Sequence, residues 1–291
     1  MRKFVHITDT HFTSSSNVRA GDLFKDQIDK LKWVVAYANA NNADILHSGD
    51  FFDKPSVPDF VKTGVIEVLK NLKGKCYVIW GNHDTLYGSS ERNYRTSLKV
   101  LAEAGVVVPV NGRIDLGECI LSSEKPIQTA EKPMIVLFHG FLNNMDGDNS
   151  IQFHELLADS KVLLLLGHDH VKYEPLAYKD MMIYRPGSFT RAIRNDSADR
   201  IPECLLIKAD EKGFEVIERP IEQAKQVELL FKDKQAKVVK SEITYQDIIE
   251  QIKNASKEKD NLKEALRMVT DEATIMYIDN AIEEYNQKHN K

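Results

Sequence analysis

Polar residues of the types that bind metal ions recur along this chain, each time directly after an apolar run. The apolar runs have the length and composition of buried strands, so the polar residues stand where strands should end. One such turn is ordinary, because Asn, Asp and Gly are common turn residues. Five of them in strand order are not explained by turn chemistry. The residues are Asp9 and His11 in TDTH, Asp50 in SGDFFD, Asn82 and His83 in GNHD, His139 in FHG, and His168 and His170 in GHDH.

The types and spacing of these side chains favour a centre that holds two metal ions. Carboxylate, amide and imidazole ligands without cysteine suit Mn²⁺, Fe²⁺ or Zn²⁺ better than Ca²⁺, and they do not suit an iron–sulfur cluster. In both DTH and HDH the polar residues stand at i and i+2, which places their side chains on the same side of an extended segment. A set of this size is too large for one tetrahedral ion. It suits two ions about 3.5–4 Å apart that share a bridging carboxylate.

Strands and helices must alternate to position these residues. Apolar residues at helical spacing separate the first three strand-like runs, and this βαβαβ order predicts a largely parallel inner sheet covered by helices. The carboxyl ends of such strands converge on one edge, where α/β proteins place their sites. We expect strands at 3–8, 43–50, 75–84, 106–110, 118–123, 134–140, 161–170 and 181–188, helices at 26–42, 57–74, 97–105 and 151–160, and a β-hairpin over 204–221 that turns at 211–213.

The character of the sequence changes near residue 222. Residues 224–242 are charged and weakly patterned, whereas residues 243–291 contain no Gly or Pro and carry apolar residues at helical spacing. We therefore predict a core at 1–222 and a small, mainly helical appendage at 223–291. The apolar stripe of the appendage either binds the coiled coil of a partner or packs back on the core, and the sequence favours neither.

Composition sets further bounds. The chain has 291 residues, 42% hydrophobic and 29% charged, as in soluble globular proteins. No apolar run approaches the roughly 18 residues needed to span a bilayer, and the N-terminal run is too short for a signal peptide, so we expect a cytoplasmic protein and no membrane partner. A net charge of −5 gives no overall attraction to nucleic acid. The widely spaced Cys76, Cys119 and Cys204 indicate buried thiols rather than disulfides or a zinc ribbon.

The ordered motifs resemble those of the calcineurin-like metallophosphoesterase superfamily. D-x-H, G-D-x-x-D, G-N-H-D, an isolated His at a strand end and G-H-x-H follow one another over roughly residues 4–190. The resemblance implies an α/β fold of four layers, two mixed β-sheets flanked by helices, and two divalent ions, Mn²⁺ in preference to Fe²⁺ or Zn²⁺. It also implies that Asp9, His11 and His170 hold one ion, that Asn82, His139 and His168 hold the other, and that Asp50 bridges them.

The same resemblance implies a catalytic role for His83, which follows a ligand without being one. His83 would donate a proton to the leaving oxygen of a phosphoester or stabilise charge on the phosphate. Asp84 either orients His83 or holds the loop, and both readings stay open. His6 and His47 lie inside strands and are expected to be core histidines. Lys54, Arg92, Arg95, Arg191 and Arg194 lie in loops near the motifs and either contact a phosphate backbone or are ordinary surface charges.

A narrower resemblance concerns the segments that follow the ligands. GDFFDKPSVP, HDHVKYEPL and above all IYRPGSFTRA, residues 183–192, are similar to SbcD-type nuclease subunits, which process DNA double-strand breaks. This similarity implies a DNA exonuclease or endonuclease in repair or recombination that works as a homodimer with an SbcC-like coiled-coil ATPase. The usual capping domain would be reduced here, because about seventy residues follow the predicted core.

Two other functions remain alternatives. The first is a stand-alone phosphatase or phosphodiesterase that acts on small nucleotides or phosphoproteins. The second is a non-catalytic scaffold of the same fold, which loss of ligands would favour; none of the expected ligands is missing. The segment at 183–192 and the helical pattern of the C-terminal residues favour the nuclease.

Overall fold

The computed structural model describes residues 1–86, 95–124, 132–143, 150–152, 161–179, 181–192 and 199–231. By its internal contacts the chain divides into one unit at Met1–Lys232 and another at Asp233–Lys291, and the described residues all belong to the first. The predicted boundary near residue 222 and the predicted helical appendage therefore stay predictions, because most of the residues concerned lie outside the described ranges.

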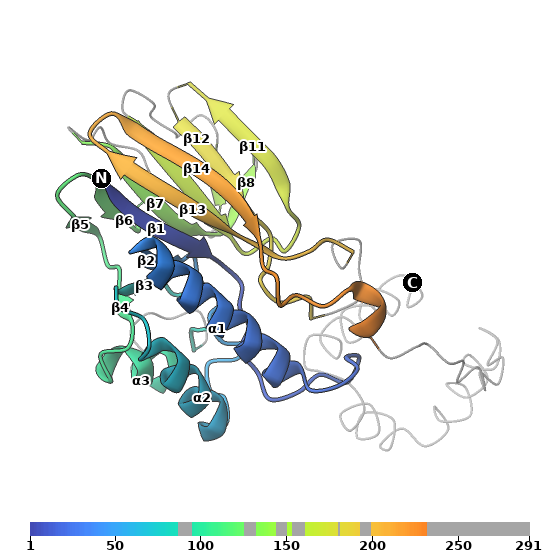
Figure 1. Ribbon diagram of the computed structural model, residues 1–291. Helices are drawn as coiled ribbons and strands as arrows, with labels where there is room; N and C mark the ends of the chain where they lie inside the picture. The colour runs from blue at the N-terminus through green and yellow to red at the C-terminus, as the bar shows by residue number, and fades with distance from the viewer. Residues whose placement is uncertain are drawn as a thin grey trace, which may run out of the picture. The chain divides into compact units, whose positions relative to one another are not determined.

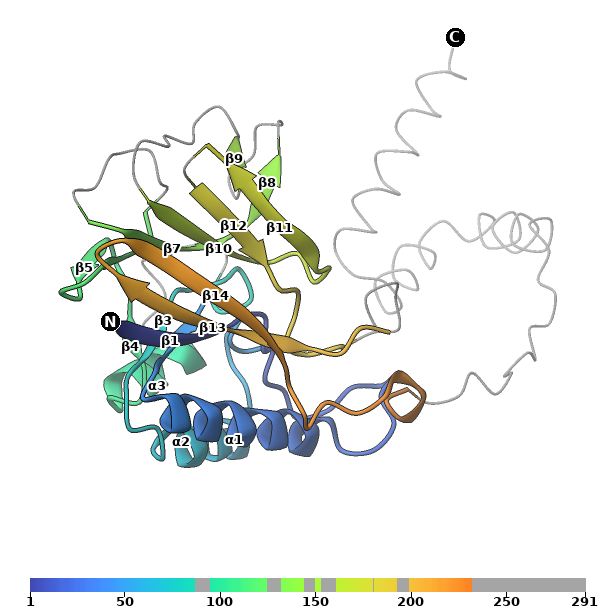
Figure 2. The same cartoon turned by 45° about the horizontal axis from the view of Figure 1, so that its top comes forward.

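Two mixed β-sheets pack face to face in the described unit (Figures 1 and 2). In the first sheet β1 to β4 are parallel, β13 pairs with β1 in the antiparallel direction, and β14 pairs with β13 in the antiparallel direction. In the second sheet β6, β7, β10 and β12 are parallel, with β5 and β11 antiparallel at the edges. The α/β fold with two mixed sheets is thus confirmed. The first sheet comprises, in spatial order, β14 (Gly213–Pro220), β13 (Glu203–Asp210), β1 (Arg2–Ile7), β2 (Asp44–His47), β3 (Cys76–Val78) and β4 (Val108–Pro109), and the second β11 (Tyr173–Tyr178), β12 (Met181–Arg185), β10 (Val162–Gly167), β7 (Met134–His139), β6 (Ile120–Ser122) and β5 (Arg113–Asp115).

The alternation of side chains along β1 shows how the core forms. Phe4 points into the layer between the two sheets, whereas Val5 and Ile7 belong to the layer between the first sheet and the helices. Leu46 of β2 and Leu165 of β10 also lie in the layer between the sheets. Both faces of β1 are therefore covered, and every residue from Phe4 to Ile7 is buried.

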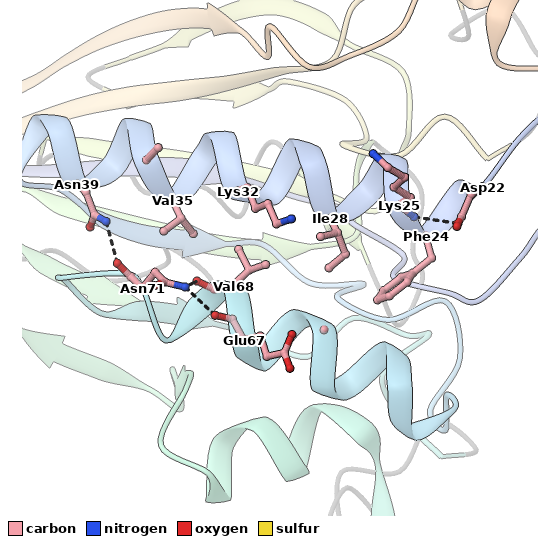
Figure 3. Close-up of a pocket in the computed structure, with 12 residues that line it drawn as sticks. Asp22, Phe24, Lys25, Ile28, Lys32, Val35, Asn39, Glu67, Val68 and Asn71 are labelled. Carbon is pink, nitrogen blue, oxygen red and sulfur yellow. Dashed lines mark hydrogen bonds between the residues drawn. The ribbon is translucent and has the colours of Figure 1, made fainter.

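Three helices cover the outer face of the first sheet: α1 (Leu23–Asn41), α2 (Asp59–Leu69) and α3 (Ser97–Glu103) (Figure 1). Helix α1 begins after Asp22, whose carboxylate accepts a hydrogen bond from the Lys25 N–H. A groove of about 690 Å³ runs between α1 and α2 (Figure 3), and its lining contains none of the candidate ligands. Within the described residues, no helix is both long and apolar enough to cross a membrane.

Several elements differ from the sequence-based expectation. Strand β9 (Ser150–Gln152) pairs with β8 (Phe141–Asn143) and occupies the first residues of the predicted helix at 151–160, whose remaining residues lie outside the described ranges. The edge strands β5 and β11 were not predicted, because β5 is only three residues long and β11 is largely exposed and lacks clean alternation. The hairpin is confirmed, and all three cysteines are buried and free. The short 3₁₀ helix η3 (Val227–Leu229) lies near the end of the described chain.

Candidate metal centre

The ends of five strands bring the predicted site residues together. Three of these strands belong to the first sheet and two to the second, so the site lies where the carboxyl ends of both sets of parallel strands meet. Asp9 and His11 follow β1, Asp50 follows β2, Asn82 and His83 follow β3, His139 ends β7, and His168 and His170 follow β10.

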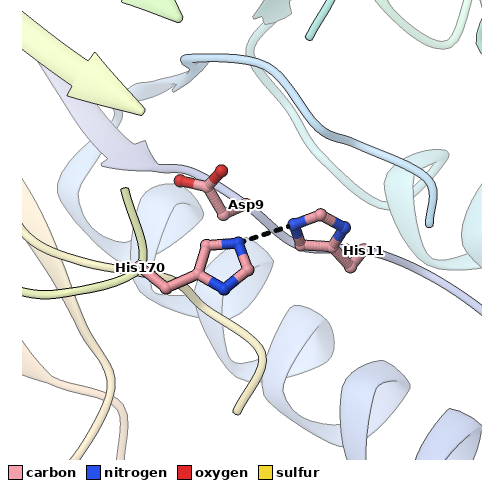
Figure 4. Close-up of side chains that lie close together, drawn as sticks. All are labelled: Asp9, His11 and His170. Atoms are coloured by element: carbon pink, nitrogen blue, oxygen red, sulfur yellow. Dashed lines mark hydrogen bonds between the residues drawn. The ribbon is translucent and has the colours of Figure 1, made fainter. Parts of the chain in front are cut away.

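Asp9, His11 and His170 form a first cluster. Their potential ligand atoms all lie within 4.8 Å of one another. Figure 4 shows the two imidazoles pointing toward each other beside the carboxylate, with 3.0 Å between the Nε2 atoms of His11 and His170. Burial lowers the pKa of His11 to about 3 and also lowers the pKa of His170. Both rings are therefore neutral near pH 7, the form in which imidazole binds a metal.

Asn82, His139 and His168 form a second cluster. The Oδ1 atom of Asn82 lies 3.0 Å from His139 Nε2 and 2.9 Å from His168 Nδ1. Asp50 lies between the clusters, because its Oδ2 atom is 3.2 Å from His139 Nε2 and 3.6 Å from His11 Nε2. One carboxylate oxygen is thus within reach of ions in both clusters, as a bridging ligand must be.

The electrostatics of the site favour bound cations. Burial raises the pKa of Asp9 to about 7. Burial would also raise the pKa of Asp50, but the hydrogen bond and charge of His139 outweigh it and hold that pKa below its usual range. Burial opposes protonation of His139, yet the Asp50 carboxylate raises its pKa to about 9. A positive charge beside Asp50 is therefore stabilised, and this set of carboxylate, amide and imidazole donors fits two divalent ions.

The loops that carry the candidate ligands are tightly constrained. Asp9, His11, Asp50 and His168 have φ values of 52°, 43°, 52° and 89°, in the left-handed region that non-glycine residues rarely adopt. Such backbone persists only where the surroundings enforce it, and it is concentrated at functional sites. Position 81 also requires glycine, because a Cβ there would lie 2.1 Å from Asp50 Oδ1 and 2.2 Å from Asp50 N.

Comparison with known proteins identifies the family. The model of the calcineurin-like phosphoesterases matches residues 2–187, well over half of the chain. The chain belongs to the calcineurin-like phosphoesterase family. Members of this family are generally metal-dependent hydrolases of phosphoesters, in agreement with the two clusters.

The solved structures that match this chain have low sequence identity to it. The protein TT1561 of Thermus thermophilus is 12% identical, with a TM-score of 0.46, over 76% of this chain and 99% of that one. A single mutant of Vps29 from Entamoeba histolytica is 14% identical, with a TM-score of 0.39, over 76% of this chain and 94% of that one. No curated protein matches the chain. These likenesses are too low to bear on function.

His83 is held beside the first cluster. Its backbone N–H donates to Asp50 Oδ1 at 2.9 Å, and its Nδ1 lies 2.7 Å from the Asp53 carbonyl oxygen. With Nδ1–H donating to that carbonyl, Nε2 is the nitrogen that can meet a substrate. The ring centre lies 4.7 Å from that of His11. His11, Asp53 and His83 also have potential ligand atoms within 4.8 Å of one another, although sequence reasoning did not place Asp53 among the ligands.

Asp84 holds the loop after β2 and the loop after β3 together. Of the two roles that the sequence left open, orienting His83 or holding the loop, the structure therefore supports the second. Its carboxylate accepts the backbone N–H groups of Phe51 and Phe52 at 2.9 Å each and of Gly81 at 3.1 Å. The side chain is buried, and burial raises the pKa of Asp84 to about 6 against the effect of these hydrogen bonds. Asp84 thereby fixes the loop of Asp50 against the loop of Asn82.

Asp84→Asn is expected to lower the free energy of unfolding by about 1–3 kcal/mol, because the amide NH₂ group would face backbone donors and leave at least one of them unsatisfied. Urea denaturation at constant pH measures the change. Mn²⁺ affinity should fall with it, since the spacing of Asp50 and Asn82 depends on this carboxylate. A variant of unchanged stability and Mn²⁺ affinity would show that Asp84 does not hold the loops.

Other residues singled out in the sequence lie as follows. His6 and His47 are fully buried in the core, with His6 Nε2 2.8 Å from Ser48 Oγ and His47 Nε2 3.0 Å from Thr10 Oγ1. Arg191 is only 5% exposed, so it is not an ordinary surface charge, and its Nη1 donates to the Arg200 carbonyl oxygen. Lys54 and Arg95 are exposed, and Arg92 and Arg194 lie outside the described residues.

Proposed function

We propose that this chain is a dinuclear-metal phosphodiesterase that hydrolyses DNA. The observation that carries the proposal is the Asp50 carboxylate oxygen, 3.2 Å from His139 Nε2 and 3.6 Å from His11 Nε2, between two clusters of donors. These donors would hold two ions a short distance apart, which would stabilise the attacking and leaving oxygens of an in-line displacement. Membership of the calcineurin-like phosphoesterase family supports the reaction class.

The roles of the residues follow from their positions. In this proposal Asp9, His11 and His170 hold one ion, Asn82, His139 and His168 hold the other, and Asp50 contributes to both. Two divalent ions, Mn²⁺ in preference to Fe²⁺ or Zn²⁺, would supply neutralisation of phosphate charge and a lowered pKa for water. In its doubly protonated form His83 donates the Nε2 proton to the leaving oxygen and becomes neutral, while its Nδ1–H bond to the Asp53 carbonyl keeps the ring in place.

Sequence features support a narrower assignment. IYRPGSFTRA at residues 183–192 is similar to the corresponding segment of SbcD-type nuclease subunits. On this basis we assign the chain to DNA double-strand break processing or recombination in the cytoplasm, as an exonuclease or endonuclease. The helical pattern of residues 243–291 supports binding of an SbcC-like coiled-coil ATPase, and the similarity to SbcD-type subunits supports a homodimer.

A second candidate is a stand-alone phosphatase or phosphodiesterase for small nucleotides or phosphoproteins. The net charge of −5 favours it, because most proteins that bind nucleic acid present a strongly basic surface. A non-catalytic scaffold is the weakest candidate, since the full set of candidate ligands is present and comes together.

The test is hydrolysis of two substrates by the purified full chain with Mn²⁺. One substrate is end-labelled duplex DNA and the other a small chromogenic phosphodiester, each also incubated with His83→Ala. The proposal expects nucleotide release from DNA that requires both Mn²⁺ and His83. If the small ester is hydrolysed rapidly while the DNA stays intact, the nuclease proposal is wrong and the stand-alone phosphodiesterase is supported instead. Hydrolysis of neither substrate would favour the scaffold.

A further inference from the structure

A short segment after β12, residues 187–191, runs along both loops that supply the first cluster. We call it the clamp segment. Its backbone N–H groups bond to carbonyl oxygens on the loop after β1 and on the loop after β10, so it joins two stretches of chain that are far apart in sequence. The bonds run from Ser188 N to His170 O at 3.2 Å, from Phe189 N to Thr8 O at 3.0 Å, and from Thr190 N to Asp9 O at 3.3 Å.

Gln27 of α1 reaches the same place from the other side. Its side chain is fully buried, and its amide nitrogen lies 3.1 Å from the Thr10 carbonyl oxygen and 2.7 Å from the His11 carbonyl oxygen. Its amide oxygen accepts the Thr13 N–H at 3.2 Å. The Thr190 hydroxyl donates to the Thr10 carbonyl at 2.6 Å and lies 3.1 Å from the Gln27 nitrogen. Two side chains thus fix the backbone on both sides of the His11 Cα.

Lys30, which is buried, and Arg200, which is half-buried, fasten the clamp segment further. The Nζ atom of Lys30, one helical turn after Gln27, donates to the Phe189 carbonyl and lies 4.1 Å from the centre of the Phe189 ring. Arg200 donates to the Ser188 hydroxyl at 3.0 Å and also to the Ser188 carbonyl. Burial lowers the pKa of Lys30 well below its usual value, so keeping this amine in the core is costly. The buried face of α1 that contacts the clamp segment is therefore unusually polar.

The second cluster has different supports. The Nδ1–H of His139 donates to the Ser48 carbonyl at 2.8 Å, in the loop after β2. In the described part of the chain, no hydrogen bond joins residues 187–190 to the three residues of the second cluster. The direct bonds of residues 187–190 thus go to the loops of the first cluster, and the Asp9 carboxylate links that cluster to the second by accepting the His168 N–H at 3.0 Å.

We infer that Gln27 and Thr190 are positioning residues for the first metal ion. They hold the backbone of Thr10 and His11 so that the donors of Asp9, His11 and His170 converge, and they leave the second ion's donors unaffected. The inference rests on the two-ion site of the proposed function. Partners of this kind, which orient ligands without touching the metal, change metal affinity by about 10–100-fold when they are removed.

The test measures each metal site separately by Mn²⁺ titration, read by electron paramagnetic resonance and calorimetry. Asn82→Ala removes a ligand of the second site and leaves the first to be measured; His170→Ala does the reverse. Gln27→Leu, which keeps the approximate size and removes the amide, is placed in each background. It should weaken Mn²⁺ binding about 10–100-fold in the Asn82→Ala background and leave it unchanged in the His170→Ala background.

Thr190 provides an independent variant and a rescue. Thr190→Val removes only the hydroxyl and should weaken the first site in the same background, whereas Thr190→Ser keeps the hydroxyl and should restore most of the affinity. Thr96→Val is the matched control: Thr96 is equally buried, but it caps α3 by accepting the Lys99 N–H. The control should lower the melting temperature without changing Mn²⁺ affinity at either site.

The outcomes separate this inference from the proposed function. If Gln27→Leu and Thr190→Val weaken both sites equally, or lower the melting temperature without changing Mn²⁺ affinity, the inference is wrong and the two residues only stabilise the fold. If the variants act on the first site alone but the wild-type chain cleaves no phosphodiester, the inference stands and the proposed function fails. A wild-type chain that binds no Mn²⁺ overturns both.

Discussion

His83→Ala is expected to lower the rate of Mn²⁺-dependent phosphodiester hydrolysis by about 10²–10⁴-fold, the usual contribution of a positioned general acid, while both metal ions stay bound. The contact of His83 with Asp50 is made by the backbone N–H at 2.9 Å, which alanine retains. Only the imidazole is lost. The measurement is kcat at saturating Mn²⁺, together with the number of Mn²⁺ ions bound per chain.

Asn82→Ala is the matched comparison, because it changes the neighbouring residue. Asn82 Oδ1 lies 3.0 Å from His139 Nε2 and 2.9 Å from His168 Nδ1, in the second cluster, so its loss should weaken the binding of one ion. His83→Ala should not. If His83→Ala released a metal ion, or left kcat unchanged, the assignment of His83 as proton donor would be wrong.

Asp50→Asn is expected to weaken the binding of both ions. The loss should exceed the roughly 10–100-fold that follows when a residue that only orients a ligand is removed. The substitution keeps the size of the side chain and an oxygen for the His83 N–H, but it removes the negative charge between the clusters. Without that carboxylate, the pKa of His139 should fall from its raised value toward its usual range, since Asp50 is the main group that raises it. Mn²⁺ titration measures both affinities.

Asp115→Asn controls for the general effect of removing a carboxylate. Asp115 is an exposed residue paired with Lys132 at 2.7 Å, and its loss should leave Mn²⁺ affinity unchanged. An Asp50→Asn variant that lost one ion and kept the other at wild-type affinity would show that the clusters bind independently and that Asp50 does not bridge them.

The convergence of the candidate ligands on the first sheet could be predicted because it depends on the order of its parallel strands, whereas the approach of His139, His168 and His170 from the second sheet depends on how the two sheets pack. Asp9, Asp50 and Asn82 each follow a buried strand, and parallel strands must bring those ends to one edge. Separation into two clusters with Asp50 between them agrees with the roles implied by the family resemblance. The ligand roles themselves await metal-binding experiments.

The supports of the site could not be predicted in the same way. Gln27 and Lys30 interrupt the apolar pattern of α1, and the sequence does not show what they bond to, because their partners lie some 160 residues away at Phe189 and Thr190. Polar residues at i and i+3 on an otherwise buried helical face were the available signal. The role of Asp84 also required the loop geometry, since it accepts one N–H from its own loop and two from the loop after the neighbouring strand β2.

The most direct test of the central claim is the electron paramagnetic resonance spectrum of the wild-type chain titrated with Mn²⁺. Two donor clusters that share the Asp50 carboxylate require two ions per chain at a separation of about 3.5–4 Å, close enough for their spins to couple. We expect a stoichiometry of two and the spectrum of a coupled pair. One ion per chain, or two ions with uncoupled spectra, would contradict the bridged two-ion site.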